Sequence, residues 1–173
     1  MRSCKIYINH TVTIILIGFI ISLSACLNND LPEPTQEGEN TFGMKVDGRN
    51  WERTYSIFSD PNRAYFSSSG RLKLIGLNTT KDERVEIRVN EVWSIGEYNM
   101  AYNISQFCGD STRFESQKQC EISYKLFDSI RSKVTITRLD TIERIIAGTF
   151  EMDLKNNEGT LKEITEGRFD YNY

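Results

Sequence analysis

The residue types that most often carry out catalysis are scarce in this chain. Its 173 residues include one histidine, His10, near the N-terminus. A Ser-His-Asp triad, a Cys-His pair and a histidine-liganded zinc site all need an imidazole, so the rest of the chain excludes these chemistries. The sequence also lacks the spacing of a glycine-rich phosphate loop or a calcium loop. We therefore expect no enzyme, no cofactor and no metal site.

Six carboxylates in the expected strands are the remaining candidates for acid–base chemistry. Two carboxyl groups about 5 to 9 Å apart can hydrolyse a glycosidic bond, so a carboxylate-dependent glycosidase is one alternative function. Outward charges on strands ordinarily keep a face solvated, whereas a working acid needs partial burial to raise its pKa. We expect all six to lie on outward, solvated faces. They are Glu86, Glu91, Glu97, Glu151, Asp153 and Asp170.

Aromatic side chains provide the strongest candidates for binding, because their flat faces can stack on sugar rings. Trp51 shares the parity of neighbouring apolar residues, so it is either a core residue or a ligand contact. Trp93 and Tyr65 lie near the ends of expected strands, where loops present side chains. The candidate ligand-binding residues are therefore Trp93, Tyr65 and Trp51, with a glycan as the expected ligand.

Residues 1–25 are typical of an export signal. Arg2 and Lys5 precede an uncharged apolar run that is too short to span a bilayer comfortably. The run ends in Leu23-Ser24-Ala25-Cys26, which resembles the lipobox of bacterial lipoproteins. The resemblance implies that Cys26 is lipidated and becomes the mature N-terminus. The alternatives are an uncleaved membrane anchor or a plain secretory peptide.

A lipidated Cys26 would attach the protein to a membrane without spanning it. Several acyl chains, each contributing about 0.8 kcal/mol per buried methylene, hold a protein at a bilayer almost permanently. We expect the cell outer membrane, with the domain facing the periplasm or the cell surface. The formal net charge of −3 argues against nucleic acid as a partner. The expected partners are the membrane, through the lipid anchor, and a glycan or an envelope protein, while the oligomeric state stays open.

Two cysteines, Cys108 and Cys120, remain outside the N-terminal region. They do not have Cys-x-x-Cys spacing, so a catalytic dithiol is not expected. Export to an oxidising compartment makes a disulfide the default for this pair, with two free thiols as the alternative. The bond would close a long connection between two strands and stabilise the fold by roughly 3 kcal/mol.

Two further resemblances concern exported proteins of Bacteroidetes. Three Asp-Ser or Asp-Thr pairs are similar to the motif at which these bacteria attach O-glycans, which implies modification of Ser111, Ser129 and Thr141. The same dipeptides are ordinary turn chemistry. The segments 42–51, 147–151 and 166–170 resemble an uncharacterised family of outer-membrane lipoproteins. That family has no assigned activity, so it implies a location and no functional residues.

Alternation of apolar and polar residues with a period of two runs through most of residues 42–173 and predicts antiparallel strands. The Asp47-Gly48 pair predicts a tight hairpin turn. The clearest alternation is in 146–154 and 167–173, and no ten-residue stretch keeps a helical spacing. The chain is therefore predicted to be all-β, with about eight to ten strands connected mostly as a meander.

Two architectures can hide the edges of such a sheet. We prefer a β-sandwich or flattened barrel over residues 42–173, because the bulky inward residues would fill its interior. A hollow, lipocalin-like barrel is the alternative. Residues 26–41 carry acidic residues, prolines and few apolar side chains, which is typical of a flexible tether behind the lipidated cysteine.

These expectations define one function and two competitors. The favoured function is a lipid-anchored envelope module that binds or scaffolds a glycan or another envelope macromolecule. A carrier of small apolar ligands would need a cavity lined by inward aromatic side chains. A glycosidase would need two carboxylates facing each other in a cleft. A solid core with a shallow aromatic patch would favour the binding module.

Overall fold

The computed structural model describes residues 31–54, 63–81, 83–101, 106–109 and 122–173. These residues form strands, turns and connections without a helix, so the all-β prediction is confirmed. No described segment is a helix long and apolar enough to cross a bilayer. The strands are β1 (Thr41–Val46), β2 (Arg49–Glu52), β3 (Arg63–Phe66), β4 (Leu72–Asn78), β5 (Glu83–Val89), β6 (Gly96–Asn99), β7 (Gln106–Gly109), β8 (Ile122–Asp140), β9 (Ile145–Lys155) and β10 (Leu161–Asn172).

All ten described strands pair antiparallel in one sheet. The order is β2-β1-β10-β9-β8-β7-β5-β4-β3, and β6 pairs with β8 beside this path. The sheet keeps two free ends, at β2 and β3, and does not close into a barrel. The hollow-barrel alternative is therefore wrong for the described strands.

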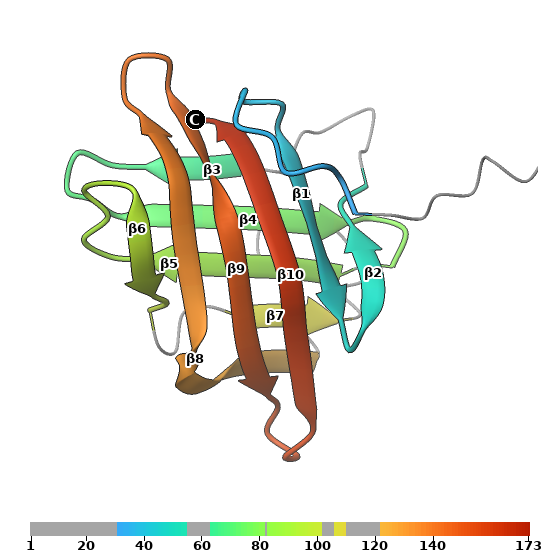
Figure 1. Cartoon of the computed structure of the whole chain (residues 1–173). Coiled ribbons are helices and arrows are strands. Elements are labelled where there is room, and N and C mark those ends of the chain that lie inside the picture. Colours follow the sequence, from blue (N-terminus) through green and yellow to red (C-terminus); the bar gives the residue numbers. More distant parts are fainter. Residues whose placement is uncertain (1–30, 55–62, 82, 102–105, 110–121) are drawn as a thin grey trace, which may run out of the picture. The chain divides into compact units, whose positions relative to one another are not determined.

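Strand β8 joins two layers of this sheet. Its first residues pair with β7, residues 133–136 pair with β6, and β9 pairs with it from Lys125 to Asp140. The register with β9 shifts between Leu126 and Lys133, where the strand changes direction. In Figure 1, β3, β4, β5 and β7 run across β8, β9, β10 and β1, as in an orthogonal sandwich. We call these the rear layer and the front layer.

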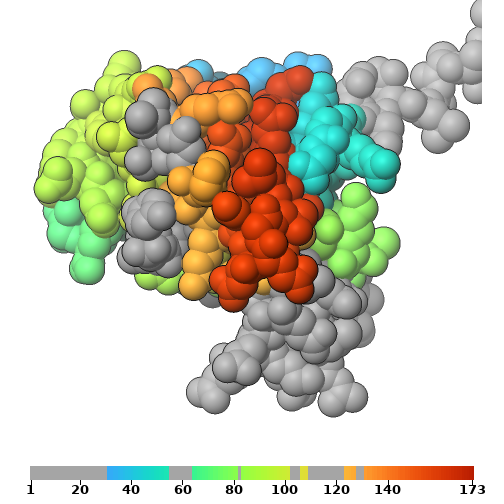
Figure 2. All heavy atoms as spheres, turned by 90° about the horizontal axis from the view of Figure 1, so that it is seen from below, coloured from blue at the N-terminus to red at the C-terminus, as the bar shows by residue number. Residues whose placement is uncertain are grey.

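Aromatic side chains fill the space between the layers. Phe42 is central, with ring centroids 5.2 Å from Phe150, 6.0 Å from Trp51 and 6.2 Å from Tyr171. Trp51 is 1% exposed, and its indole Nε1 donates a hydrogen bond of 2.6 Å to Glu83. Trp51 is thus a core residue, and its burial removes it from the candidates for ligand binding. Figure 2 shows the β9–β10 turn in red at the centre of one end, between β2 and the loops near β6.

The folded unit begins earlier than residue 42. It spans Leu31–Tyr173, and Leu31 is itself buried. We call residues 31–40 the strap, because they lie along the front layer and bond to β8 and β10. The prediction of a flexible tether through residue 41 is therefore wrong for these residues, and Thr41 already belongs to β1.

Several predicted sites fall partly or wholly outside the described residues. Cys108 is buried in β7, whereas Cys120 lies outside the described part, so the disulfide stays a prediction. Ser111 and the predicted lipidation site Cys26 also lie outside it, and the side chain of Ser129 is not described. Thr141 is exposed in the turn between β8 and β9. Its modification stays a prediction.

Candidate functional site

Two of the six carboxylates expected on solvated faces are buried. Glu86 in β5 is 3% exposed and Asp170 in β10 is 1% exposed. Both lie on the outer side of their strands, because their neighbours in sequence belong to the core. Their burial comes from groups that cover the outer side. The prediction that these two residues lie on the outer side of their strands is confirmed, but the prediction that they are solvated is wrong.

Asp170 is covered by the strap. Its carboxylate accepts hydrogen bonds from the Thr35 hydroxyl at 2.7 Å and from the backbone N–H groups of Glu37, Gly38 and Glu39 at 2.9 to 3.1 Å. Three successive N–H groups pointing at one oxyanion form a nest, which suits a negative charge. This buried carboxylate is therefore saturated by the chain itself and holds the strap on β10.

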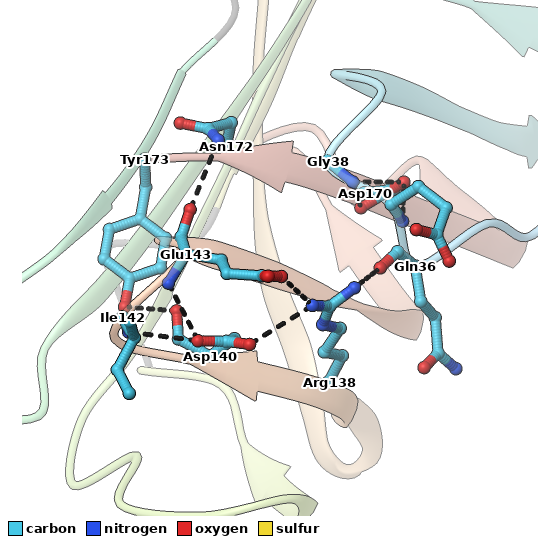
Figure 3. A network of polar contacts seen from close by, with 10 residues as sticks. Gln36, Gly38, Arg138, Asp140, Ile142, Glu143, Asp170, Asn172 and Tyr173 are labelled. Carbon is cyan, nitrogen blue, oxygen red and sulfur yellow. Dashed lines mark hydrogen bonds and ion pairs between the residues drawn. The ribbon is translucent and has the colours of Figure 1, made fainter.

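A second set of contacts fixes the same end of the strap (Figure 3). Arg138 donates to the backbone carbonyl of Gln36 and pairs with Asp140 at 3.2 Å and Glu143 at 2.5 Å. The Asp140 carboxylate accepts the backbone N–H groups of Glu143 and Ile142. The N–H of Glu143, followed by Arg138, holds the pKa of Asp140 below its ordinary value. The polar groups at this end therefore satisfy one another.

Glu86 is satisfied by cationic side chains instead. Its carboxylate pairs with Arg84 at 2.5 Å, with Arg88 at 2.6 Å and with Lys73 at 3.7 Å. Burial raises the pKa of Glu86, but the hydrogen bond from Arg88 and the three positive charges outweigh it, so the pKa lies below its ordinary value. The carboxylate therefore stays ionised at neutral pH.

The cations around Glu86 remain in contact with solvent. The side chains of Lys73, Arg84 and Arg88 are 32% to 42% exposed. They share the outer face of the rear layer with Tyr65, because the alternate residues Leu72, Leu74, Val85 and Ile87 point into the core. Tyr65 is 48% exposed, and the Lys73 ammonium lies 5.7 Å from the centre of its ring. We call Tyr65, Lys73, Arg84, Glu86 and Arg88 the cationic face.

Trp93 lies at the end of the same layer, beside the turn between β3 and β4. Its side chain is 63% exposed and packs on Gly70, where a Cβ atom would lie 2.9 Å from two indole carbons. Val92 is fully buried, and its N–H donates to the Gly70 carbonyl at 2.9 Å. One part of the indole is thus seated on backbone while most of the ring faces solvent. We call Trp93 and Gly70 the indole platform.

Tyr98 of β6 fixes the loop that carries the platform. Its hydroxyl donates to the Ser94 carbonyl at 2.8 Å and accepts the N–H groups of Trp93 and Ser94 at 3.4 and 3.2 Å. The hydrogen bond with the Ser94 side chain keeps the pKa of Tyr98 below its ordinary value. These hydrogen bonds connect the loop that carries Trp93 to β6.

Polar groups in the β3–β4 turn adjoin the platform. The hydroxyls of Ser67 and Ser69 lie 2.8 Å apart, and the Arg71 Nε donates to Ser69 at 3.1 Å. Arg71 also donates its backbone N–H to Ser67 at 3.2 Å. Arg71 lies two residues before Lys73 and therefore points to the same outer side of the layer. The turn thus connects the platform to the cationic face.

The front layer has a groove on its outer face, next to the strap. The groove measures about 630 Å³, and Pro34 of the strap forms part of its rim. Its cations have partners, since Lys133 pairs with Glu97 and Arg131 pairs with Asp153 and Glu163. The groove contains the exposed carboxylates Glu97 and Glu151 but is lined by as many cations as carboxylates, namely Arg131, Lys133 and Arg168 against Glu97, Glu151 and Glu166. It is therefore charge-balanced.

Metal chemistry finds no support in the described part of the chain, where no three potential ligands of the His, Cys, Asp or Glu type lie together. Comparisons with protein-family models, with curated proteins and with solved structures found no match. Inferences about function therefore rest on the geometry of the described residues. Of the predicted binding residues, Trp93 and Tyr65 lie exposed on the rear layer, and Trp51 does not.

The cations of the cationic face were not among the predicted site residues. A signal was present in the sequence, because Arg84, Glu86 and Arg88 alternate along one strand and must share one side. The position of Lys73 opposite Arg88 follows only from the pairing of β4 with β5. Local spacing thus identifies two of the three cations, and strand pairing adds the third.

Proposed function

We propose that this protein is a lipid-anchored envelope module that binds a glycan at the indole platform. The supporting observation is the exposed Trp93 ring, which packs on Gly70 while the Trp93 backbone N–H donates to the Tyr98 hydroxyl. A rigid, solvent-facing indole can stack on the apolar face of a sugar ring without first losing conformational freedom. The filled space between the layers and the shallow aromatic surface are the features expected of a binding module.

Polar groups near the platform support the same proposal. Sugar recognition needs hydrogen-bonding groups beside a stacking surface, because each ring carries several hydroxyls. Ser67, Ser69 and Arg71 provide hydroxyl and guanidinium groups in the adjoining turn. Their mutual hydrogen bonds place these groups before a ligand arrives, which lowers the entropic cost of binding.

Glycan binding is tested with the full chain on a glycan array, followed by titration of the best ligand. Trp93→Ala is expected to weaken binding by about tenfold or more, because it removes the stacking surface. Ile95→Ala is the matched control, since Ile95 is 64% exposed in the same loop. Equal affinities of wild type and Trp93→Ala for the array ligand would contradict the proposal.

The lipid anchor is tested separately. Intact-mass analysis of protein extracted from membranes should show acyl chains on Cys26, and Cys26→Ala should release the domain or leave its precursor unprocessed. Normal membrane attachment of Cys26→Ala would refute the anchor without affecting the glycan-binding proposal.

A further inference from the structure

The cationic face carries more positive than negative charge. Three cations and one carboxylate form its ion-pair cluster, which gives the cluster a net charge of +2. The whole chain has a formal net charge of −3, so this excess is a local feature and not a reflection of composition. An anion approaching the outer side of β4 and β5 would be attracted.

Glu86 fixes the positions of these cations. It lies between Arg84 and Arg88 on β5, two residues from each, and draws both guanidinium groups toward one buried carboxylate. Long basic side chains normally lose several rotamers when they bind an anion. Here that ordering is already part of the fold, so the cations form a preorganised set.

Donor groups remain for a ligand within this set. Arg84 uses one terminal nitrogen, Nη2, for Glu86, and its side chain remains 40% exposed. The Lys73 ammonium stands 3.7 Å from Glu86, which is longer than a direct hydrogen bond. Both cations are thus neutralised only in part by the carboxylate they share.

The basic surface extends to the next strands. Gln106 of β7 pairs with Glu86 on one side and with Lys125 of β8 on the other. Lys125 is exposed, and two strand spacings place it about 10 Å from Glu86. The face is therefore extended along a row of strands, which suits a polymer more than a single small ion.

We propose that the cationic face binds the acidic groups of a glycan, with Lys73 and Arg84 holding its carboxylate, sulfate or phosphate oxygens and Tyr65 contacting the ring. The proposal rests on the proposed function, because the indole platform adjoins this face through Arg71. It names the ligand class, an acidic polysaccharide.

The test uses polygalacturonate and its fully methyl-esterified form, which share one sugar backbone and differ in charge. Wild-type full chain should bind the acid at least about tenfold more tightly than the ester, and added salt should reduce the difference. The variant Lys73→Gln/Arg84→Gln should lose this preference. The variant Arg131→Gln/Lys133→Gln removes the same charge from the front layer and should keep it.

The outcomes separate the two proposals. If wild type binds both polymers with equal affinity and Trp93→Ala loses this binding, the inference of an acidic ligand is overturned and the proposal of a glycan-binding module is kept. Failure to bind either polymer or any array glycan would overturn both. Equal losses in the two double variants, or preferential binding to phosphatidylglycerol vesicles, would show general charge attraction or membrane binding and overturn the inference. The single variant Tyr65→Ala changes no charge and is expected to weaken binding of polygalacturonate. It provides a second test if Lys73→Gln/Arg84→Gln does not fold.

Discussion

Two buried carboxylates, Asp170 and Glu86, have opposite effects on the surfaces around them. Asp170 accepts four donors from the strap, and its charge is used within the chain. Glu86 gathers three basic side chains whose outer parts stay in solvent. Asp170 holds the strap against the front layer. Glu86 leaves an excess of positive charge on the outer face of the rear layer. Burial of a charge therefore fixes a chain segment in one layer and gathers solvent-exposed cations in the other.

The partner groups explain the difference. Backbone N–H groups carry only partial charges, so the nest around Asp170 leaves no cation facing solvent. Arginine and lysine side chains carry full charges and several donors, so one carboxylate cannot saturate three of them. The comparison predicts that a change at Asp170 acts mainly on stability, while a change at Glu86 also acts on ligand binding.

The largest expected effect is that of Asp170→Asn on stability. The amide can accept fewer of the strap donors and carries no charge, so we expect a loss of about 3 kcal/mol in the free energy of unfolding. Urea unfolding of the full chain measures it, and proteolysis should cut faster within residues 31–40. Asp153→Asn is the control, because Asp153 is half-buried and has a single exposed partner, Arg131. A change below about 0.5 kcal/mol for Asp170→Asn would contradict a stabilising role of this carboxylate.

Glu86→Gln is expected to cost less stability, about 2 kcal/mol, because its three cationic partners can still be solvated. The same variant should alter binding of polygalacturonate, since the cations lose their common fixed position. Glu97→Gln is the control, because Glu97 also pairs with a cation but is exposed. Unchanged acid binding in Glu86→Gln would show that the carboxylate does not organise the cationic face.

The stability supplied by Glu86 should depend on pH in a defined direction. Its pKa is lower in the folded than in the unfolded chain, so the folded state favours the ionised form. The contribution is complete above about pH 4.3, the ordinary pKa of glutamate, and is lost as the pH falls through the lower, folded value. The difference in unfolding free energy between wild type and Glu86→Gln should therefore shrink on acidification. A difference that grows below pH 4 would contradict this sign.

Gly70→Ala has the smallest expected effect on stability and tests the indole platform. Gly70 has a φ of +70°, and an added methyl would meet the Trp93 ring. Gly48→Ala is a close control, with a φ of +76° and no atom within 4 Å of the new methyl. Each variant should lose about 1 kcal/mol of stability through backbone strain. Only Gly70→Ala should weaken glycan binding, and equal binding by both variants would argue against the platform.

Local patterns predict much of the fold. The alternation in 146–154 and 167–173 corresponds to β9 and β10, and Asp47-Gly48 forms the turn between β1 and β2 with both residues at positive φ. These strands have one face in the core and one face outward, so their apolar and polar residues alternate with a period of two that is visible in the sequence. The exposed positions of Trp93 and Tyr65 agree with their predicted places near strand ends.

Contacts between residues far apart in the chain do not follow from local sequence patterns. Asp170 is buried by strap residues more than 130 positions away. The polar composition of the strap, taken alone, predicts a flexible tether, because nothing in the local sequence indicates its hydrogen bonds to that carboxylate. Residues 122–126 and 134–136 read as two strands, yet β8 continues through both and joins the layers. The cluster at Glu86 likewise depends on the pairing of β4 with β5, which places Lys73 opposite Arg88.

The central claim is that the rear layer, and not the front layer, receives an acidic glycan. Amide hydrogen exchange of the full chain, with and without polygalacturonate, tests it most directly. We predict slower exchange in 63–78 and 83–95, which contain the cationic face and the indole platform. Exchange should be unchanged in the strap and in residues 131–140 of β8, which lie in the front layer. Protection centred on residues 31–40 and on the groove of the front layer would contradict the account.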